Sequence, residues 1–115
     1  MLCYIVREPL FPLGNILISP EIITLCVDAQ SLLRRHQFGD FGCVDPYDID
    51  RNHHAIKSGE GILSQYEVMV GEMTIMICVM TETDRAYTVI FVLDKEKLKF
   101  LNAPENGNNR EPEGS

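Results

Sequence analysis

The pattern of apolar and polar positions in the second half of the chain predicts three consecutive β-strands. The runs ILSQYEV (62–68), MTIMICVM (73–80) and AYTVIFVL (86–93) are rich in the β-branched and aromatic residues that favour strands. A VGE turn separates the first two runs, and the loop TETDR separates the last two. Residues 62–93 are therefore expected to form three antiparallel strands. Two of the runs are apolar on both faces, so at least one strand should be central, covered on both sides or buried in a dimer.

The first half of the chain carries two signals for the start of a helix. In the segment SPE (19–21), Ser19 suits the N-cap, the proline suits the first helical position and the glutamate favours the helix dipole. Apolar residues then keep a helical period up to Gln37, with a break expected near Asp28. The glycines of the FGDFG segment end this region.

The second start signal is Asp45-Pro46, which predicts a helix over residues 46–57. Its apolar face should be narrow, because Ile49, His53 and Ile56 fall at positions i, i+4 and i+7. The segment GEG (59–61) ends this helix.

Two short extended segments are expected before the first helix, at residues 2–6 and at Asn15–Ile18. The fold class that follows is α+β, with two or three short helices packed on an antiparallel meander of three to four strands. A chain of 115 residues has room for one domain, which we expect to span residues 1–101. The ending, 102–115, is rich in Asn, Gly, Pro and Glu and is predicted to be a flexible acidic tail.

The charge of the chain restricts its partners. With 10 Lys and Arg against 17 Asp and Glu, the formal net charge is −7. An acidic surface repels phosphate backbones, so no direct binding to nucleic acid is expected. Such a surface suits solubility, a basic protein partner, or the imitation of nucleic-acid charge.

The N-terminal sequence and the cysteines indicate a cytoplasmic protein. The first apolar run covers only residues 2–6, too short for a signal-peptide core or a membrane span. Four widely spaced cysteines (Cys3, Cys26, Cys43 and Cys78) contain no CxxC pair. In a reducing compartment we expect them to be small buried hydrophobic residues, and neither a disulfide framework nor a zinc site.

Several motifs resemble those of one bacterial family. They are FPLG (11–14), SP (19–20), LLRRHQFGDFGCVD (32–45), GILSQY (61–66) and VMTETDRAYTVI (79–90), with Asn52 and Ala55 between them. Over roughly residues 11–94 the chain resembles small "plasmid-related" proteins carried on plasmids and integrative elements. It departs from them in its strand-like N-terminus, its shortened first helix and its long acidic tail. The resemblance implies a setting in mobile DNA, where small acidic proteins often act against host defence, and it supplies no mechanism.

The polar stretch RHQFGDFGCVDPYDIDRNHHA (35–55) raises the question of a metal site. His36 with Asp40, and Asp50 with His54, have the i, i+4 spacing that places two ligands on one helix face. Gly39, however, should end the first helix before Asp40, and the second pair lacks an evident third ligand. We therefore expect no metal and no cofactor.

Catalysis is also disfavoured. The acids near Cys43 would raise the pKa of its thiol, and no phosphate-binding loop or serine nucleophile motif is present. A general acid–base pair of His36 with Asp40 or Glu82 is the enzymatic alternative. A structural interpretation is stronger: Asp45 caps the second helix, His53 packs against the sheet, and Arg85 pairs with Glu82 or reaches the RHQFGD loop.

Two functional hypotheses follow. The first is a non-enzymatic acidic protein that inhibits a host defence complex with a basic surface, of the anti-CRISPR or anti-restriction type, and that forms a homodimer through the sheet or its edge. The second is a small enzyme or ligand-binding module with His36, Asp40, Asn52, Glu82, Asp84 and Arg85 around one cleft. Convergence of these six side chains on one pocket would favour the second hypothesis. The candidate binding residues are Asp45, Asp48, Asp50, Glu60, Glu82, Asp84, Arg85, His36 and Asp40.

Overall fold

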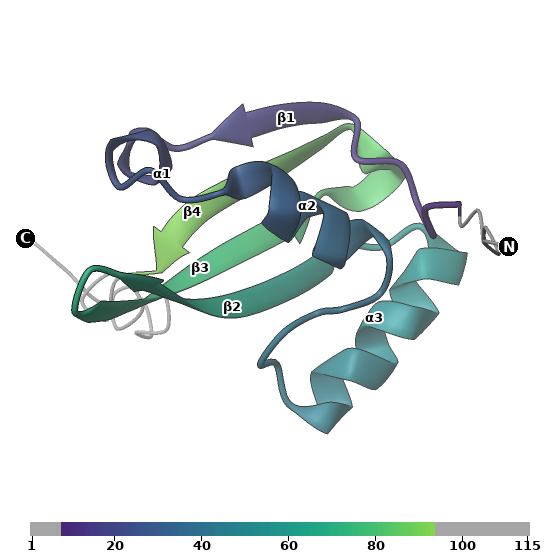
Figure 1. Ribbon diagram of the computed structural model, residues 1–115. Helices are drawn as coiled ribbons and strands as arrows, with labels where there is room; N and C mark the ends of the chain where they lie inside the picture. The colour runs from purple at the N-terminus through teal and green to yellow at the C-terminus, as the bar shows by residue number, and fades with distance from the viewer. Residues whose placement is uncertain (1–7, 94–115) are drawn as a thin grey trace, which may run out of the picture.

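The computed structural model describes residues 8–93, which form an α+β fold as predicted (Figure 1). The described elements are β1 (Asn15–Ile18), α1 (Pro20–Thr24), α2 (Ala29–Gln37), α3 (Pro46–Ser58), β2 (Ile62–Val70), β3 (Met73–Thr81), a 3-10 turn (Thr83–Arg85) and β4 (Tyr87–Leu93). The predicted strand at residues 2–6 and the predicted tail at 102–115 lie outside the described residues. No helix within residues 8–93 is long and apolar enough to cross a membrane.

The sheet contains the predicted antiparallel meander and one strand more. β2, β3 and β4 pair antiparallel in sequence order, while β1 pairs parallel with β4, which gives the strand order β1-β4-β3-β2. The expectation of a purely antiparallel sheet is therefore wrong for β1. β3 and β4 are the two central strands, and they contain the two runs that are apolar on both faces. The prediction that at least one of these strands is central is therefore confirmed.

The first helical region is broken, as expected, near Asp28. Cys26 has a left-handed conformation with φ of 57°, which ends α1, and the Asp28 carboxylate accepts a hydrogen bond from the backbone N–H of Ser31 to start α2. The predicted side-chain cap by Ser19 is wrong. Ser19 lies at the N-cap of α1, but its buried hydroxyl oxygen has no hydrogen-bond partner among the described residues.

The apolar core has two parts. α1 and α2 cover one face of the sheet (Figure 1), and the larger part lies beneath them: Ile22, Leu32, Leu33, Tyr66, Ile77, Val79 and Ile90. The smaller part lies where α3 and the loop before it meet the start of β2: Phe11, Phe41, Val44, Ala55 and Ile62. α3 is thus packed at one end of the sheet and does not lie across it.

This position of α3 corrects the predicted buried face. The helix begins at the Asp45 cap as expected and ends at Gly59, whose φ is 85°. Ile49 and Ile56 pack against the smaller part of the core as predicted, but the fully buried residues are Asn52 and Ala55. His53 is exposed and lies against Phe41, with ring centroids 5.5 Å apart. The reason is the Asn52 amide, which donates to the Leu63 carbonyl at 2.7 Å and accepts from the Leu63 N–H at 3.1 Å. These two bonds fix the rotation of α3 about its axis.

Two of the three described cysteines differ from the prediction. Cys78 is buried in the central strand β3, but Cys26 and Cys43 are exposed. Cys26 occupies the turn after α1, and Cys43 lies in the loop beside β2, where its thiol donates to the Gln65 carbonyl at 3.3 Å. Both therefore lie in connections at the surface of the fold.

Two glycines with left-handed backbones are expected to respond differently to alanine. A Cβ at Gly42 (φ 76°) would lie 1.9 Å from the Gln65 carbonyl oxygen, while a Cβ at Gly59 (φ 85°) would meet nothing within 4 Å. Gly59→Ala should cost only the left-handed backbone strain, about 1 kcal/mol, whereas Gly42→Ala must also displace the loop from β2 and should cost about 2 kcal/mol. Urea unfolding of both variants measures this difference. Equal costs would show that the loop moves without penalty.

Candidate functional site

The polar stretch 35–55 forms the end of α2, a loop and most of α3, and the loop is attached to the edge of β2. The Gln65 N–H donates to the Phe41 carbonyl at 3.1 Å, and the Cys43 N–H donates to the Gln65 carbonyl at 2.8 Å. Gly42 lies between them as a parallel bridge partner of Gln65. The loop therefore covers the free edge of β2 at this point.

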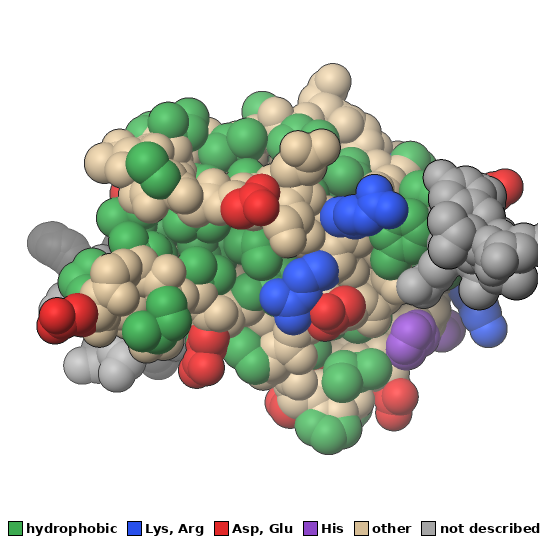
Figure 2. Space-filling view, viewed as in Figure 1, with side chains coloured by type: hydrophobic (Ala, Val, Ile, Leu, Met, Phe, Trp, Pro, Cys, Tyr) green, Lys and Arg blue, Asp and Glu red, His purple; other side chains and the backbone are tan. Residues whose placement is uncertain are grey.

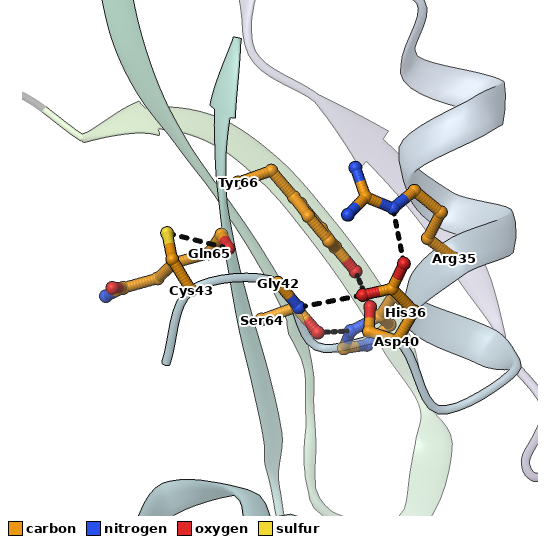
Figure 3. Close-up of polar contacts among 8 residues, drawn as sticks. All are labelled: Arg35, His36, Asp40, Gly42, Cys43, Ser64, Gln65 and Tyr66. Atoms are coloured by element: carbon orange, nitrogen blue, oxygen red, sulfur yellow. Dashed lines mark hydrogen bonds and ion pairs between the residues drawn. The ribbon is translucent and has the colours of Figure 1, made fainter. Parts of the chain in front are cut away.

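The exposed side of the loop is closed by an ion pair (Figure 3). Arg35 Nε lies 2.7 Å from Asp40 Oδ2, Asp40 Oδ1 accepts from the Gly42 N–H at 3.1 Å, and the Arg35 guanidinium stacks over the Tyr66 ring at 4.5 Å. The Tyr66 hydroxyl donates to the Asp40 carbonyl at 2.6 Å. The bond from Arg35 lowers the pKa of Asp40, and burial raises the pKa of Tyr66 to about 12. All of these contacts hold the loop in place.

His36 lies inside the molecule beneath this loop. Its side chain is fully buried, with Nδ1 2.6 Å from the Ser64 hydroxyl and Nε2 2.8 Å from the Thr81 hydroxyl. Thr81 lies 2.8 Å from the Thr88 hydroxyl, which in turn donates to the Leu13 carbonyl at 2.7 Å. Three strands and α2 thus meet in one buried polar chain.

The donor and acceptor of each hydrogen bond in this buried series can be assigned from the Leu13 carbonyl at which the series ends. A carbonyl oxygen only accepts, so the Thr88 proton goes to Leu13, and Thr88 must accept the proton of Thr81. Thr81 then accepts from His36 Nε2–H, and the unprotonated Nδ1 accepts from Ser64. The network therefore fixes a proton on Nε2, and in the neutral imidazole Nδ1 is the acceptor.

Burial keeps the His36 ring neutral. It lowers the pKa of the imidazole from 6.5 to about 4, with a smaller contribution from the positive charge of Arg85. The predicted acid–base pair of His36 with Asp40 or Glu82 is wrong, because both ring nitrogens bond to hydroxyl groups of other residues. Ser64 and Thr81 are also fully buried, so this series of hydrogen bonds is inaccessible to a substrate. Its role is to hold the core together.

Arg85 binds backbone carbonyls, including that of its predicted partner Glu82 at 3.5 Å, and forms no ion pair with the Glu82 carboxylate. Its guanidinium donates to the Ala55 carbonyl at 2.8 Å and to the Glu60 carbonyl at 2.6 Å, and it lies 5.6 Å from the centre of the Phe11 ring. A positive charge is favourable at the C-terminus of a helix, where carbonyls lack intrahelical partners. Arg85 therefore caps α3 and ties it to the turn before β4.

The two acids of that turn also have local roles. Glu82 accepts from the Thr83 N–H at 3.1 Å and from the Tyr87 hydroxyl at 2.9 Å, and these bonds lower the pKa of its carboxyl. Asp84 has a left-handed backbone with φ of 66°, and its N–H donates to the Gly59 carbonyl at 3.1 Å. Asp is one of the few residues that tolerate this conformation, which agrees with its predicted turn position.

The six candidate side chains do not converge on a pocket. A shallow groove of about 330 Å³ lies between the end of α3 and the β2–β3 pair. Of the six, only Glu82 lines it, since His36 and Asn52 are buried in separate hydrogen-bond networks and Asp40 is paired with Arg35 on the surface. The alternative hypothesis required these side chains to line one cleft, and the described residues do not show that arrangement.

The acids proposed for partner binding form two groups around α3. Asp45 and Asp48 lie at its N-terminus, where Asp45 caps the helix and Asp48 lies 3.6 Å from Arg51. Glu60 follows its C-terminus and shares the groove with Glu82, with Asp84 bonded nearby. Asp50 is exposed on the helix between the groups. Figure 2 shows acidic side chains distributed over the visible face without a single dense patch.

The sequence patterns did not reveal the roles of Ser64 and Thr81, which bond to His36, or of Thr88, which bonds to Thr81. Each is a small polar residue at an inward position of a strand, and Ser64 lies between the buried Ile62 and Tyr66. A polar residue within an apolar face is a signal that a buried polar partner exists. Which partner it has depends on the packing of α2, which the strand pattern does not contain.

No cluster of three metal-binding side chains (His, Cys, Asp or Glu) occurs within residues 8–93. Comparison of the chain with family models, with curated proteins and with solved structures finds no match. The resemblance to plasmid-related proteins therefore rests on its sequence motifs alone.

Proposed function

We propose that this protein is a non-enzymatic binding protein that uses the acidic surface around α3 to recognise a basic protein partner. One observation carries the proposal: the side chains suited to chemistry are used to hold the fold, while the acids remain available at the surface. His36, Asn52 and Arg85 have internal hydrogen-bond partners, whereas Asp50 and Glu60 are exposed.

Charge supports the same interpretation. The net charge of −7 attracts a basic surface over a distance set by the ionic strength and repels nucleic acid. Proteins that handle nucleic acid have basic grooves, so they are natural targets of such a surface. The resemblance to plasmid-related proteins supplies the setting, in which the partner is a host defence complex and the outcome is inhibition of the anti-CRISPR or anti-restriction type.

The test is a double charge reversal at Asp50 and Glu60. Among residues 8–93, neither carboxylate makes a hydrogen bond or an ion pair, so Asp50→Lys with Glu60→Lys should change stability by less than about 0.5 kcal/mol each. Asp45 and Asp48 are unsuitable because the first caps α3 and the second lies in its first turn. Partner binding should weaken by about tenfold or more, equivalent to about 1.4 kcal/mol.

The matched control is Glu67→Lys with Glu72→Lys, which changes the net charge equally on the exposed β2–β3 hairpin. Proteins captured from host lysate by the native chain are identified, purified and titrated against all three forms at low and high salt. The α3 variant should lose affinity, the hairpin variant should keep it, and salt should weaken the native complex. An affinity that changes neither with the charge reversal on α3 nor with salt would contradict the acidic-surface proposal.

A further inference from the structure

The two edges of the sheet differ in how far other parts of the described chain cover them. The loop at residues 41–43 covers part of the β2 edge, but no strand or loop of the described chain pairs with the outer edge of β1. β1 contains Ile16, Leu17 and Ile18, which are 45%, 51% and 41% exposed. It has no charged residue, and proline occurs only outside it, so the usual protections of an edge strand are missing.

The hydrogen-bonding groups of this edge can be assigned. The Asn15 N–H donates to the Ala86 carbonyl at 3.2 Å, and the Ser19 N–H donates to the Ile90 carbonyl at 3.0 Å. Because these groups alternate in direction along a strand, the N–H and C=O of Ile16 and Ile18 point away from β4. They are available to a further strand.

Apolar surface accompanies this free edge. Figure 2 shows hydrophobic side chains gathered over β1 and α1, where Ile23 is 68% exposed. On the side of the sheet that α2 covers, a hollow of about 200 Å³ lies beside Ile16 and is lined by Leu13, Leu33 and three polar residues of α2. This volume is several times that of a water molecule, roughly 30 Å³. An added strand with an aliphatic residue opposite Ile16 would fill it.

We propose that the occupant is β1 of a second copy, paired antiparallel about a twofold axis at Leu17. In this register Ile16 lies opposite the partner's Ile18, so the four free N–H and C=O groups of each edge are bonded. The register also places the partner's Ile18 beside the hollow next to Ile16, on the same face of the sheet. Leu17 meets its own copy on the opposite face.

Charge favours a second copy at this edge. A chain with a net charge of −7 repels itself, and the uncharged strand Asn15–Ile18 is where two copies approach with least repulsion. The strand order β1-β4-β3-β2 separates β1 from α3, which contacts β2. The result is a continuous eight-stranded sheet whose two acidic α3 surfaces lie at opposite ends. This proposal does not depend on the proposed partner of α3.

The experiment is sedimentation of the full chain from about 5 μM to about 500 μM, a range that brackets small interfaces. The native chain should dimerise, while Leu17→Lys and Leu17→Glu should each raise the dissociation constant at least about tenfold, since like charges would face each other across the axis. An equimolar mixture of the two variants should regain the dimer as a Lys–Glu pair. The control Met69→Lys, at an exposed methionine of β2, should dimerise normally.

Four results would overturn the proposal. They are a native chain that stays monomeric at all concentrations, a dimer that resists both Leu17 variants, a mixture that stays monomeric, and a dimer lost in Met69→Lys. Removal of residues 1–7 tests the alternative occupant, because a chain that dimerises only after this removal must have its own N-terminal segment on the edge. Circular dichroism confirms that each variant is folded.

Discussion

Replacement of His36 by alanine is expected to lower the free energy of unfolding by about 4 kcal/mol. The change deletes a fully buried ring and leaves a cavity beside Phe11, whose ring centroid lies 5.1 Å from that of His36. It also leaves the hydroxyl groups of Ser64 and Thr81 without the partners they have at 2.6 and 2.8 Å. A buried polar group without a partner costs about 1 to 3 kcal/mol, so the two effects add.

Urea unfolding at pH 7.5 measures this loss, and His54→Ala is the matched control. His54 is exposed on α3, and its replacement should change stability by less than about 0.5 kcal/mol. If His36→Ala fails to fold, Thr88→Val provides the test, because it keeps the side-chain volume and removes only the hydroxyl between Thr81 and Leu13. That variant should lose about 2 kcal/mol. Near-native stability of Thr88→Val would mean that the hydroxyl chain contributes little.

The sequence predicted well those elements that local patterns determine. The strands of 62–93 follow from β-branched runs, and α3 follows from the Asp45-Pro46 start and the glycine at its end, because each signal lies within a few residues of the structure it specifies. β1 was expected as an extended segment, but its parallel pairing with β4 joins residues more than 70 positions apart. No local pattern specifies such a partner.

The roles of the two histidines were assigned the wrong way round, for a physical reason. Helical periodicity placed His53 on a buried face, but the Asn52 amide binds the backbone of Leu63 and turns α3 so that Asn52 and Ala55 face inward. His36, a candidate ligand or catalytic residue by sequence, is instead buried against two hydroxyl groups, those of Ser64 on β2 and Thr81 on β3. Both outcomes depend on contacts between elements, which amphipathicity alone does not describe.

The same limit applies to Arg85. Sequence reasoning paired it with a carboxylate, the usual partner of an arginine in a sequence. The structure pairs it with the carbonyls of Ala55 and Glu60 at the end of α3. Every residue has a backbone carbonyl, so the sequence does not show which carbonyls an arginine will bind. The contact of Arg85 with the end of α3 follows only from the three-dimensional arrangement of the helix and the turn.

Acidification is expected to reduce stability in a way that reports directly on His36. The folded pKa of about 4 lies below the unfolded value of 6.5, so between these values the unfolded chain binds a proton that the folded chain does not. Stability is therefore complete above pH 6.5 and declines as the pH falls. The loss from this group should reach about 2 kcal/mol at pH 5 and about 3 kcal/mol at pH 4, below which it levels off.

Between pH 6.5 and pH 5, the pH dependence of stability that is due to His36 can be distinguished from that due to the carboxylates. The pKa values of Asp40 and Glu82 are also lowered, but their contribution is lost only near and below about pH 4, the unfolded value for such groups. Urea unfolding across this window measures the loss, and nitrogen NMR of the imidazole tests its origin. The ring should stay neutral down to about pH 5 because burial disfavours its charged form, and its proton should lie on Nε2 because the hydrogen bonds of Thr81 and Thr88 end at the Leu13 carbonyl. A His36 that titrates near 6.5, or a proton on Nδ1, would contradict this network.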